Sequence, residues 1–275
     1  MLKQFQTHFY GFELADTEVV AINAYGWGKK FEKGSVQSTL IRFTGLPHLG
    51  SRIRNRILED ILRNKNLSEK TLFDAGCGIG LESVHLASRF KEVEGADIET
   101  KKVGQANKLV RENRLRNSKY FQADLTDNNI KNKKYDYIIS LEVIEHVSND
   151  KNFVLTLKKL LNHGGTVIVS FPSMTLLSKI AQRSLNHYKV GYNLEDFGTL
   201  LKDTDLVITE KHSFGNSILG KSVIALDFVF KKTLPFLSVL FFPLFYPLLV
   251  LDRQLPNFGI PRGYVLVLRK NDKER

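Results

Sequence analysis

A short glycine-rich stretch carries the strongest chemical signal in this sequence. An apolar run ending at Asp74 leads into Ala-Gly-Cys-Gly-Ile-Gly at positions 75–80, and a helical pattern begins near Leu81. Glycines let the backbone turn tightly and let a ligand approach closely, while the first N–H groups of a helix favour polar ligands. A dinucleotide fingerprint needs a glycine at position 81, so the leucine there argues against a nicotinamide or flavin site.

Two more acids follow, at the ends of the next two predicted strands. Asp97 is placed to accept both hydroxyls of a ribose, and Asp124 is placed to meet the exocyclic amine of an adenine. Each acid alone also has a structural interpretation: Asp74 can cap a turn, Asp97 can cap the following helix, and Asp124 can belong to a polar loop. Together they end three successive strands, which is where open α/β sheets bind ligands.

Short apolar runs that alternate with helical segments must position these acids. The pattern changes near Thr71 to one that is typical of βα units and a parallel sheet. The predicted strands cover 71–76, 92–98, 119–124, 135–141, 165–171, 206–214 and 263–269. The predicted helices cover 80–90, 100–115, 150–162 and 194–203, and Gly164 and Gly165 are expected to end the third.

This alternation predicts an α/β fold with one doubly wound, mostly parallel, seven-stranded sheet. Before the first strand, Ile53, Ile57 and Ile61 recur at helical spacing among arginines, which predicts a helical cap. We expect an N-terminal extension and cap over 1–65 and one large domain over 66–275, with a hydrophobic helical insertion at 215–262.

Five segments occur in the order that a known family also shows. They are 74–80, Gly95-Ala-Asp-Ile98, Ala123-Asp-Leu125, 135–146 and 160–172. These motifs resemble those of the class I S-adenosylmethionine-dependent methyltransferases, and Glu-Val-Ile-Glu-His at 142–146 looks most like the branch that contains ubiquinone and menaquinone methyltransferases. The resemblance spans roughly residues 65–214 and implies a Rossmann-like fold with S-adenosyl-L-methionine as cofactor.

The resemblance also implies roles for individual residues. Gly76 and Gly78 are expected to approach the methionine part, Asp97 to hold the ribose and Asp124 to bind the adenine amine. Ile98 and Leu125 would flank the adenine, and Leu141 and Glu142 would border the sulfonium. We expect Cys77 to fill space rather than to act as a nucleophile. The candidate cofactor-binding residues are Asp74, Gly76, Cys77, Gly78, Gly80, Asp97, Ile98, Asp124, Leu125 and Leu141.

Methyl transfer from a sulfonium is an in-line displacement, so alignment of the partners and removal of water supply much of the rate. A hydroxyl acceptor also needs a base, for which histidine is suited. The candidate catalytic residues are His146, His187, Glu142 and Tyr188. As alternatives, His146 can stabilise its own helix start, and His187 and Tyr188 can anchor a surface loop. Glu142, Glu145 and His146 also form an alternative set of metal ligands, but we assign no metal.

The stretch from Thr233 to Leu251 contains 19 residues without a charge, which is nominally long enough to span a bilayer. Pro235, Pro243 and Pro247 argue against one straight span. An odd number of crossings would also put the last predicted strand on the wrong side of the membrane. We therefore predict two or more kinked helices that lie in one leaflet of a membrane or form a hydrophobic cap. The basic residues available for acidic headgroups are Lys221, Lys231, Lys232, Arg253 and Arg262. The alternative is a buried lid or a dimer interface.

Composition limits the partners of the chain. Its 275 residues are 43% apolar and 25% charged, which is typical of a globular protein, and the net charge of +11 favours anionic partners. The basic residues are dispersed, so we expect no nucleic-acid partner. The single cysteine excludes an intrachain disulfide, and residues 1–16 lack the apolar core of a secretory signal. We expect a cytoplasmic enzyme that is peripheral on the inner face of the membrane.

We therefore expect a methyltransferase that acts on a hydrophobic or lipid-linked acceptor, at oxygen or carbon. Three alternatives stay open: a soluble methyltransferase of small metabolites with the insertion as a lid, an RNA or protein methyltransferase, and a non-catalytic ligand-binding protein. Fold alone does not choose among acceptors.

Overall fold

The computed structural model describes residues 48–127, 130, 133–175, 179 and 188–271. They divide into two compact units, each described here by itself. The sheet unit comprises Asn64–His212 and the chain from Gly263, and the hairpin unit comprises the helix before Arg63 together with Ser213–Arg262. Most of the predicted N-terminal extension lies outside the described residues.

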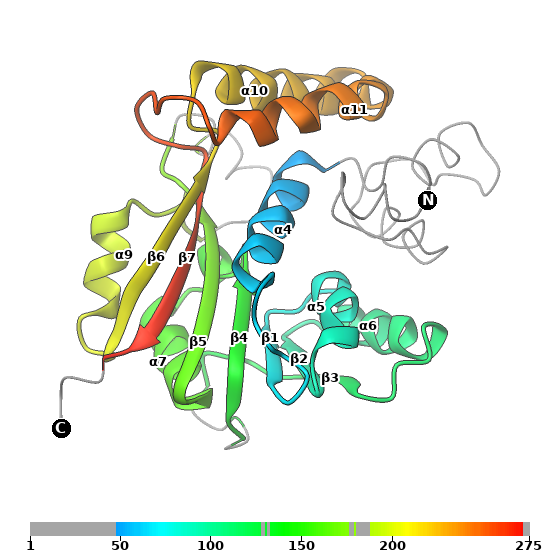
Figure 1. The fold of residues 1–275 in the computed structure, drawn as a ribbon, viewed down its shortest axis with the longest axis vertical. Coiled ribbons are helices and arrows are strands. Elements are labelled where there is room, and N and C mark those ends of the chain that lie inside the picture. The colour runs from blue at the N-terminus through cyan, green and yellow to red at the C-terminus, as the bar shows by residue number, and fades with distance from the viewer. Residues whose placement is uncertain (1–47, 128–129, 131–132, 176–178, 180–187, 272–275) are drawn as a thin grey trace. The chain divides into compact units, whose positions relative to one another are not determined.

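The sheet unit contains seven strands in the order β3-β2-β1-β4-β5-β7-β6 (Figure 1). Strands β1 to β5 pair in parallel, and β7 runs antiparallel to β5. All seven predicted strands and the mostly parallel sheet are confirmed. The strands are β1 (Thr71–Ala75), β2 (Glu92–Asp97), β3 (Ser118–Gln122), β4 (Tyr135–Leu141), β5 (Leu161–Pro172), β6 (Leu206–Phe214) and β7 (Gly263–Lys270).

Helices cover both faces of this sheet. One face packs on α6, where Val103 and Ala106 meet Tyr120, and the other packs on α7 and α9 through Phe153 and Phe197. Burial of these apolar faces supplies the main driving force for the fold. The helices are α5 (Leu81–Leu86), α6 (Thr100–Glu112), α7 (Asp150–Leu160) and α9 (Leu194–Leu201), with the 3₁₀ turns η1 (Ala87–Arg89) and η2 (Ile144–His146).

The expectation that Gly164 and Gly165 end a helix is wrong. Helix α7 already ends at Leu160, and both glycines lie inside β5. Gly164 has a φ of +69°, and a Cβ on Gly165 would lie 3.0 Å from the backbone oxygen of Asp136 on the neighbouring strand. The register between β4 and β5 also shifts near this point. The two glycines therefore allow an irregularity in β5, because glycine is favoured at strand bulges as well as at helix ends.

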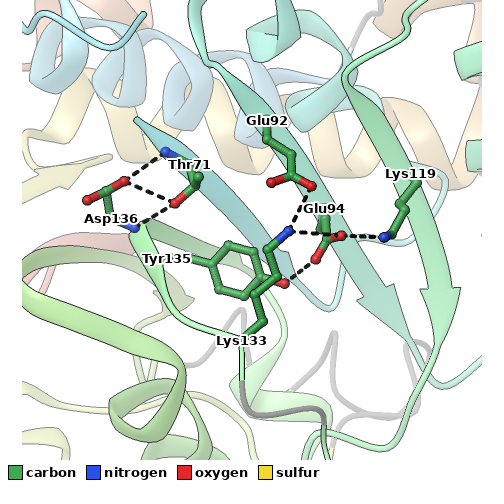
Figure 2. A network of polar contacts seen from close by, with 7 residues as sticks. All are labelled: Thr71, Glu92, Glu94, Lys119, Lys133, Tyr135 and Asp136. Atoms are coloured by element: carbon green, nitrogen blue, oxygen red, sulfur yellow. Dashed lines mark hydrogen bonds and ion pairs between the residues drawn. The ribbon is translucent and has the colours of Figure 1, made fainter. Parts of the chain in front are cut away.

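A polar network crosses β2, β3 and β4 on the face that carries α7 (Figure 2). The Glu94 side chain is buried and accepts a hydrogen bond from the hydroxyl of Tyr135. The Nζ atoms of Lys119 and Lys133 lie 2.8 and 3.2 Å from Glu94 Oε1, and Lys133 also pairs with Glu92 at 2.7 Å. The buried carboxylate is therefore compensated by two ammonium groups and a hydroxyl.

The hairpin unit contains α4 (Leu49–Leu62), α10 (Ile218–Thr233) and α11 (Pro235–Asp252). The predicted cap helix and the predicted helical insertion are thus both present. The carboxylate of Asp252, at the end of α11, accepts hydrogen bonds from the backbone N–H groups of Asn216 and Ser217 at the start of α10. These bonds connect the start of the hairpin to its end, and Asp252 is fully buried there. Within the described residues, no helix has both the length and the hydropathy to cross a membrane.

Candidate functional site

The glycine turn lies at the carboxyl end of β1. Gly76, Gly78 and Gly80 have φ values of +79°, +53° and +77°, a conformation that favours glycine. A Cβ on Gly76 would lie 2.5 Å from the side chain of Val143, whereas a Cβ on Gly78 would meet no heavy atom within 4 Å. The thiol of Cys77 is buried, and burial raises its pKa, so it stays uncharged as expected of a space-filling residue. The turn thus combines a closely packed first glycine with open space at the second.

Asp97 ties the glycine turn to the end of β2. Its Oδ2 accepts the backbone N–H of Gly78 at 2.9 Å, and its Oδ1 accepts that of Glu99 at the same distance. Glu99, not Asp97, is the N-cap of α6. Because a carboxylate has about four lone-pair sites, both oxygens retain the capacity to accept a ligand hydroxyl.

Asp124 follows β3 and forms a local turn. Its Oδ1 accepts the backbone N–H of Thr126 at 2.8 Å and the Thr126 hydroxyl at 2.6 Å, as the structural interpretation of this acid expects. Asp124 is exposed, so this turn leaves it accessible. Of the two residues expected to flank an adenine, Ile98 is 61% exposed and Leu125 is buried.

Asp74 lies beneath the turn in a buried polar chain that the sequence did not reveal. The hydroxyl of Ser83 donates to Asp74 Oδ2 at 2.5 Å and lies 2.8 Å from the Tyr120 hydroxyl. Burial raises the pKa of Asp74 to about 8, so this group is largely neutral at pH 7. Tyr120 comes from β3, and no sequence pattern links it to a residue on β1.

The carboxyl end of β4 approaches the glycine turn. Leu141 is the last residue of β4, Glu142 follows it, and Val143 is the residue that packs against Gly76. Glu142 has a φ of +56°, and its backbone N–H donates to the backbone oxygen of Ser170 on β5. Ser170 was not among the candidate residues, because its contact with Glu142 arises only from the pairing of β4 with β5.

Three of the four candidate catalytic residues belong to the described part of the chain. His146 is exposed in η2, Tyr188 is 68% exposed, and His187 lies outside the described residues. The backbone N–H of Lys189 donates to the oxygen of Glu145, and that of Tyr192 donates to the oxygen of Pro172, each at 3.0 Å. These bonds hold the segment 188–192 against η2 and the end of β5. Tyr188 there lines an open groove of about 770 Å³ together with Met174 and Leu200.

The alternative ligand set for a metal does not gather in the described part of the chain. Glu145 is buried, His146 is exposed, and no group of three His, Cys, Asp or Glu side chains among the described residues is arranged to hold a metal ion.

Comparison with known proteins adds the decisive observation. A family model described as a methyltransferase domain matches residues 73–169. The ubiquinone biosynthesis O-methyltransferase of Rickettsia akari is 31% identical over 181 residues, which cover 60% of this chain and 71% of the relative.

The chain belongs to the class I S-adenosylmethionine-dependent methyltransferases. Its fold also matches solved structures. Magnesium protoporphyrin IX methyltransferase from Synechocystis PCC 6803, with bound SAH, gives a TM-score of 0.57 at 18% identity and covers 92% of this chain and 94% of that chain. Phosphoethanolamine N-methyltransferase 2 from Haemonchus contortus, in complex with S-adenosyl-L-methionine, gives 0.58 at 17% identity and covers 99% and 60%.

The residues of this methyltransferase fit its cofactor, S-adenosyl-L-methionine. The space at Gly78 admits a ligand that a side chain would exclude, and Asp97 beside it presents two carboxylate oxygens. The glycine turn and the ends of β2, β3 and β4 therefore meet at one edge, as the sequence predicted for the strands.

Proposed function

We propose that this methyltransferase transfers its methyl group to a hydrophobic or lipid-linked small molecule, at oxygen or carbon. The observation that carries the proposal is the set of large apolar side chains that the hairpin leaves exposed. Clustered exposed apolar side chains mark surfaces that contact a membrane, a protein or an apolar ligand. A relative named for ubiquinone biosynthesis, at 31% identity, supports an acceptor of lipid-like chemistry.

At the cofactor end we propose the roles that the sequence suggested. Gly76 and Gly78 approach the methionine part, Asp97 receives the ribose hydroxyls and Asp124 meets the adenine amine. Ile98, Leu125 and Leu141 supply apolar contacts, while Asp74, Cys77 and Gly80 shape the turn from beneath. The hydrogen bonds that Asp97 accepts from the backbone N–H groups of Gly78 and Glu99 support the ribose assignment, because they orient both carboxylate oxygens.

At the acceptor end, the cofactor supplies an electrophilic methyl group, and the chain aligns the acceptor and takes its proton. We propose His146 or His187 as the base, with Glu142 and Tyr188 at the mouth of the site. The exposure of His146 and Tyr188 supports this assignment, since a base must be reachable by an incoming acceptor.

We also propose that the hairpin contacts a membrane surface. Both helices expose apolar residues at spacings of three, four, seven or eight, which place them along one side of each helix. They are Ile218, Leu226 and Val229 on α10, and Phe236, Leu240, Leu244 and Leu251 on α11; Phe241, which is also exposed on α11, lies next to this side. Of the basic residues expected to meet headgroups, Lys231 and Arg253 pair with Asp227 and Asp60, whereas Lys232 is exposed.

Co-sedimentation with vesicles tests the membrane contact. We would compare phosphatidylcholine vesicles with and without phosphatidylglycerol, at low and high salt. The wild type should bind at high salt, and Leu240→Ser with Leu244→Ser should weaken binding by about tenfold or more. A matched control is Val207→Ser with Ile208→Ser, which changes two exposed apolar residues of β6. A wild type that sediments with neither vesicle would make the hairpin a lid or a protein contact.

An acceptor series tests the substrate class. We would follow the labelled methyl group of S-adenosylmethionine into catechols and hydroquinones that carry alkyl tails of increasing length. The specificity constant should rise with tail length, by up to about fourfold for each methylene that becomes buried. Equal turnover of short and long acceptors would contradict a hydrophobic acceptor.

A further inference from the structure

Residues 188–192, called the docked segment below, are fastened to the sheet unit by two backbone hydrogen bonds. The N–H of Lys189 donates to the oxygen of Glu145 in η2, and the N–H of Tyr192 donates to the oxygen of Pro172 at the end of β5, each at 3.0 Å. Two such bonds are few for five residues. The side chains of the docked segment therefore decide how firmly it is held.

The docked segment reaches the strand end that also contacts the glycine turn. Glu145 lies two residues after Val143, whose side chain would be 2.5 Å from a Cβ on Gly76. The docked segment also carries Tyr188, which is 68% exposed and lines the open groove. It therefore connects the surroundings of the glycine turn to this groove.

Asp150, the first residue of α7, binds two side chains of the docked segment through one oxygen. Its Oδ2 accepts a hydrogen bond from the ammonium group of Lys189 and another, at 2.8 Å, from the hydroxyl of Tyr192. Burial alone would raise the pKa of Asp150, but the hydrogen bonds from Lys189 and Tyr192 outweigh it and hold this pKa below its ordinary value. Asp150 is therefore ionised at neutral pH.

These contacts are stronger than an ordinary ion pair at the surface, which contributes little because water competes for both charges. The side chain of Asp150 is only 15% exposed. Tyr192 is buried, and its ring lies 5.4 and 6.1 Å from the rings of Phe171 and Phe197. Its hydroxyl thus meets the carboxylate with little water present, and a hydrogen bond to a charged acceptor is about twice as strong as a neutral one.

We propose that Asp150 is a positioning residue for the methyl acceptor: through Lys189 and Tyr192 it keeps the docked segment, and with it Tyr188, in the form that binds the acceptor. This inference rests on the proposed function, which places Tyr188 at the mouth of the site. A protein whose binding-competent form is only partly populated binds its ligand more weakly by that fraction. Loss of the Asp150 carboxylate therefore raises the KM for the acceptor and leaves kcat and cofactor affinity nearly unchanged.

Steady-state kinetics with an alkylated catechol as the acceptor tests this role. Asp150→Ala should raise the KM for the catechol by about tenfold or more, roughly the effect of one hydrogen bond to a charged group, and change kcat by less than about twofold. Asp150→Glu keeps a carboxylate and should restore most of the wild-type affinity. Lys189→Met removes one donor on an exposed side chain, so it should act like Asp150→Ala without affecting the fold.

The matched control is Asp203→Ala. Asp203 lines the same groove but pairs with Lys151 at 2.6 Å, so its loss should leave the KM within about twofold. The affinity for S-adenosylhomocysteine, measured by calorimetry, should stay within about twofold in every variant. An unchanged KM in Asp150→Ala, or an equal rise in the control, would overturn the proposal. An equal loss of S-adenosylhomocysteine affinity would also overturn it, because the effect would then not be specific to the acceptor.

Hydrogen exchange on the full chain separates this proposal from the proposed acceptor class. The amides of Lys189 and Tyr192 should exchange at least about tenfold faster in Asp150→Ala than in the wild type, because their bonds to Glu145 and Pro172 open more often. Unchanged exchange would overturn the positioning role, whatever the acceptor is. A wild type that methylates no catechol or hydroquinone would instead contradict the proposed function, and the exchange rates would still decide whether Asp150 holds the docked segment.

Discussion

Asp97 is the residue whose substitution tests the ribose assignment most directly. Its carboxylate already holds the N–H groups of Gly78 and Glu99, and we propose that it also receives the ribose. Hydrogen bonds to a charged group contribute about 1.5–3 kcal/mol each. Asp97→Ala should therefore weaken S-adenosylhomocysteine binding by about tenfold to a hundredfold, as measured by calorimetry. Glu112→Ala, at the far end of α6, is the control. Wild-type affinity in Asp97→Ala would contradict the ribose assignment.

Asp74 should make stability depend on pH. Its pKa is 3.8 in the unfolded chain and about 8 in the fold, mainly because of burial. Between these values the unfolded state has lost a proton that the folded state keeps, so the free energy of unfolding falls as the pH rises. Asp74→Asn has no titratable group at this position. The wild type should lose about 1.4 kcal/mol per pH unit relative to this variant between about pH 5 and 7. Parallel denaturation profiles would contradict the buried neutral acid.

The site residues that could be predicted from the sequence are those that directly follow a predicted strand. Asp97 and Asp124 end strands, and parallel strands bring their carboxyl ends to one edge whatever packs behind them. Ser170 and Tyr120 were missed because their contacts cross between strands. Such contacts depend on register and on side-chain direction, which no local pattern reports.

The network around Glu94 should stabilise the β2–β4 region (Figure 2). Burial alone raises the pKa of Glu94, but hydrogen bonds from Lys119, Tyr135 and Lys133 outweigh it and hold this pKa below 4.5. Tyr135→Phe removes a donor to a buried carboxylate and should cost about 1.5–3 kcal/mol in denaturant unfolding. Tyr137→Phe makes the same change on the opposite face of β4 and should cost less than about 0.5 kcal/mol. The stabilisation that the network gives is fully present at a pH above the ordinary pKa of a carboxyl group. It is lost as the pH falls through the lowered pKa of Glu94. Equal costs for both variants would contradict its role.

Two helical glycines should respond to alanine in opposite directions. A Cβ on Gly220 in α10 would lie 2.2 Å from Asp252 Oδ1, so Gly220→Ala should cost about 1–3 kcal/mol. A Cβ on Gly104 in α6 would meet nothing within 4 Å, so Gly104→Ala should stabilise by up to about 1 kcal/mol. Chemical denaturation of both variants measures the difference. Stabilisation by Gly220→Ala would show that α10 and α11 do not approach this closely.

Helices and strands were predictable from the sequence where the apolar residues recur at one clear spacing. Most strands and the helices α4, α6, α7 and α9 follow apolar spacing that the structure then buries, whereas β6 is largely exposed. The end of α7 was not predictable from Gly164 and Gly165, because glycine favours a helix end and a strand irregularity alike. Only the pairing of β5 with β4 distinguishes them.

Replacing 215–261 with a short loop should preserve cofactor binding and abolish vesicle binding. The insertion begins and ends at adjacent points, since the backbone N–H of Arg262 donates to the oxygen of Phe214 at 2.9 Å. The glycine turn, Asp97, Asp124 and Glu142 all belong to the sheet unit. Affinity for S-adenosylhomocysteine should stay within about threefold, a change below 1 kcal/mol. Loss of cofactor binding, with the sheet still folded by circular dichroism, would show that the insertion completes the cofactor site.

The position of β7 between β5 and β6 sets an order of events during synthesis. A ribosome releases β6, then the apolar helices α10 and α11, and only afterwards β7, the strand that pairs between β5 and β6. Until then β5 and β6 present unpaired edges while the hairpin is already outside the exit tunnel, a state prone to aggregation. We therefore expect the yield of folded enzyme to rise when a chaperone is present during synthesis.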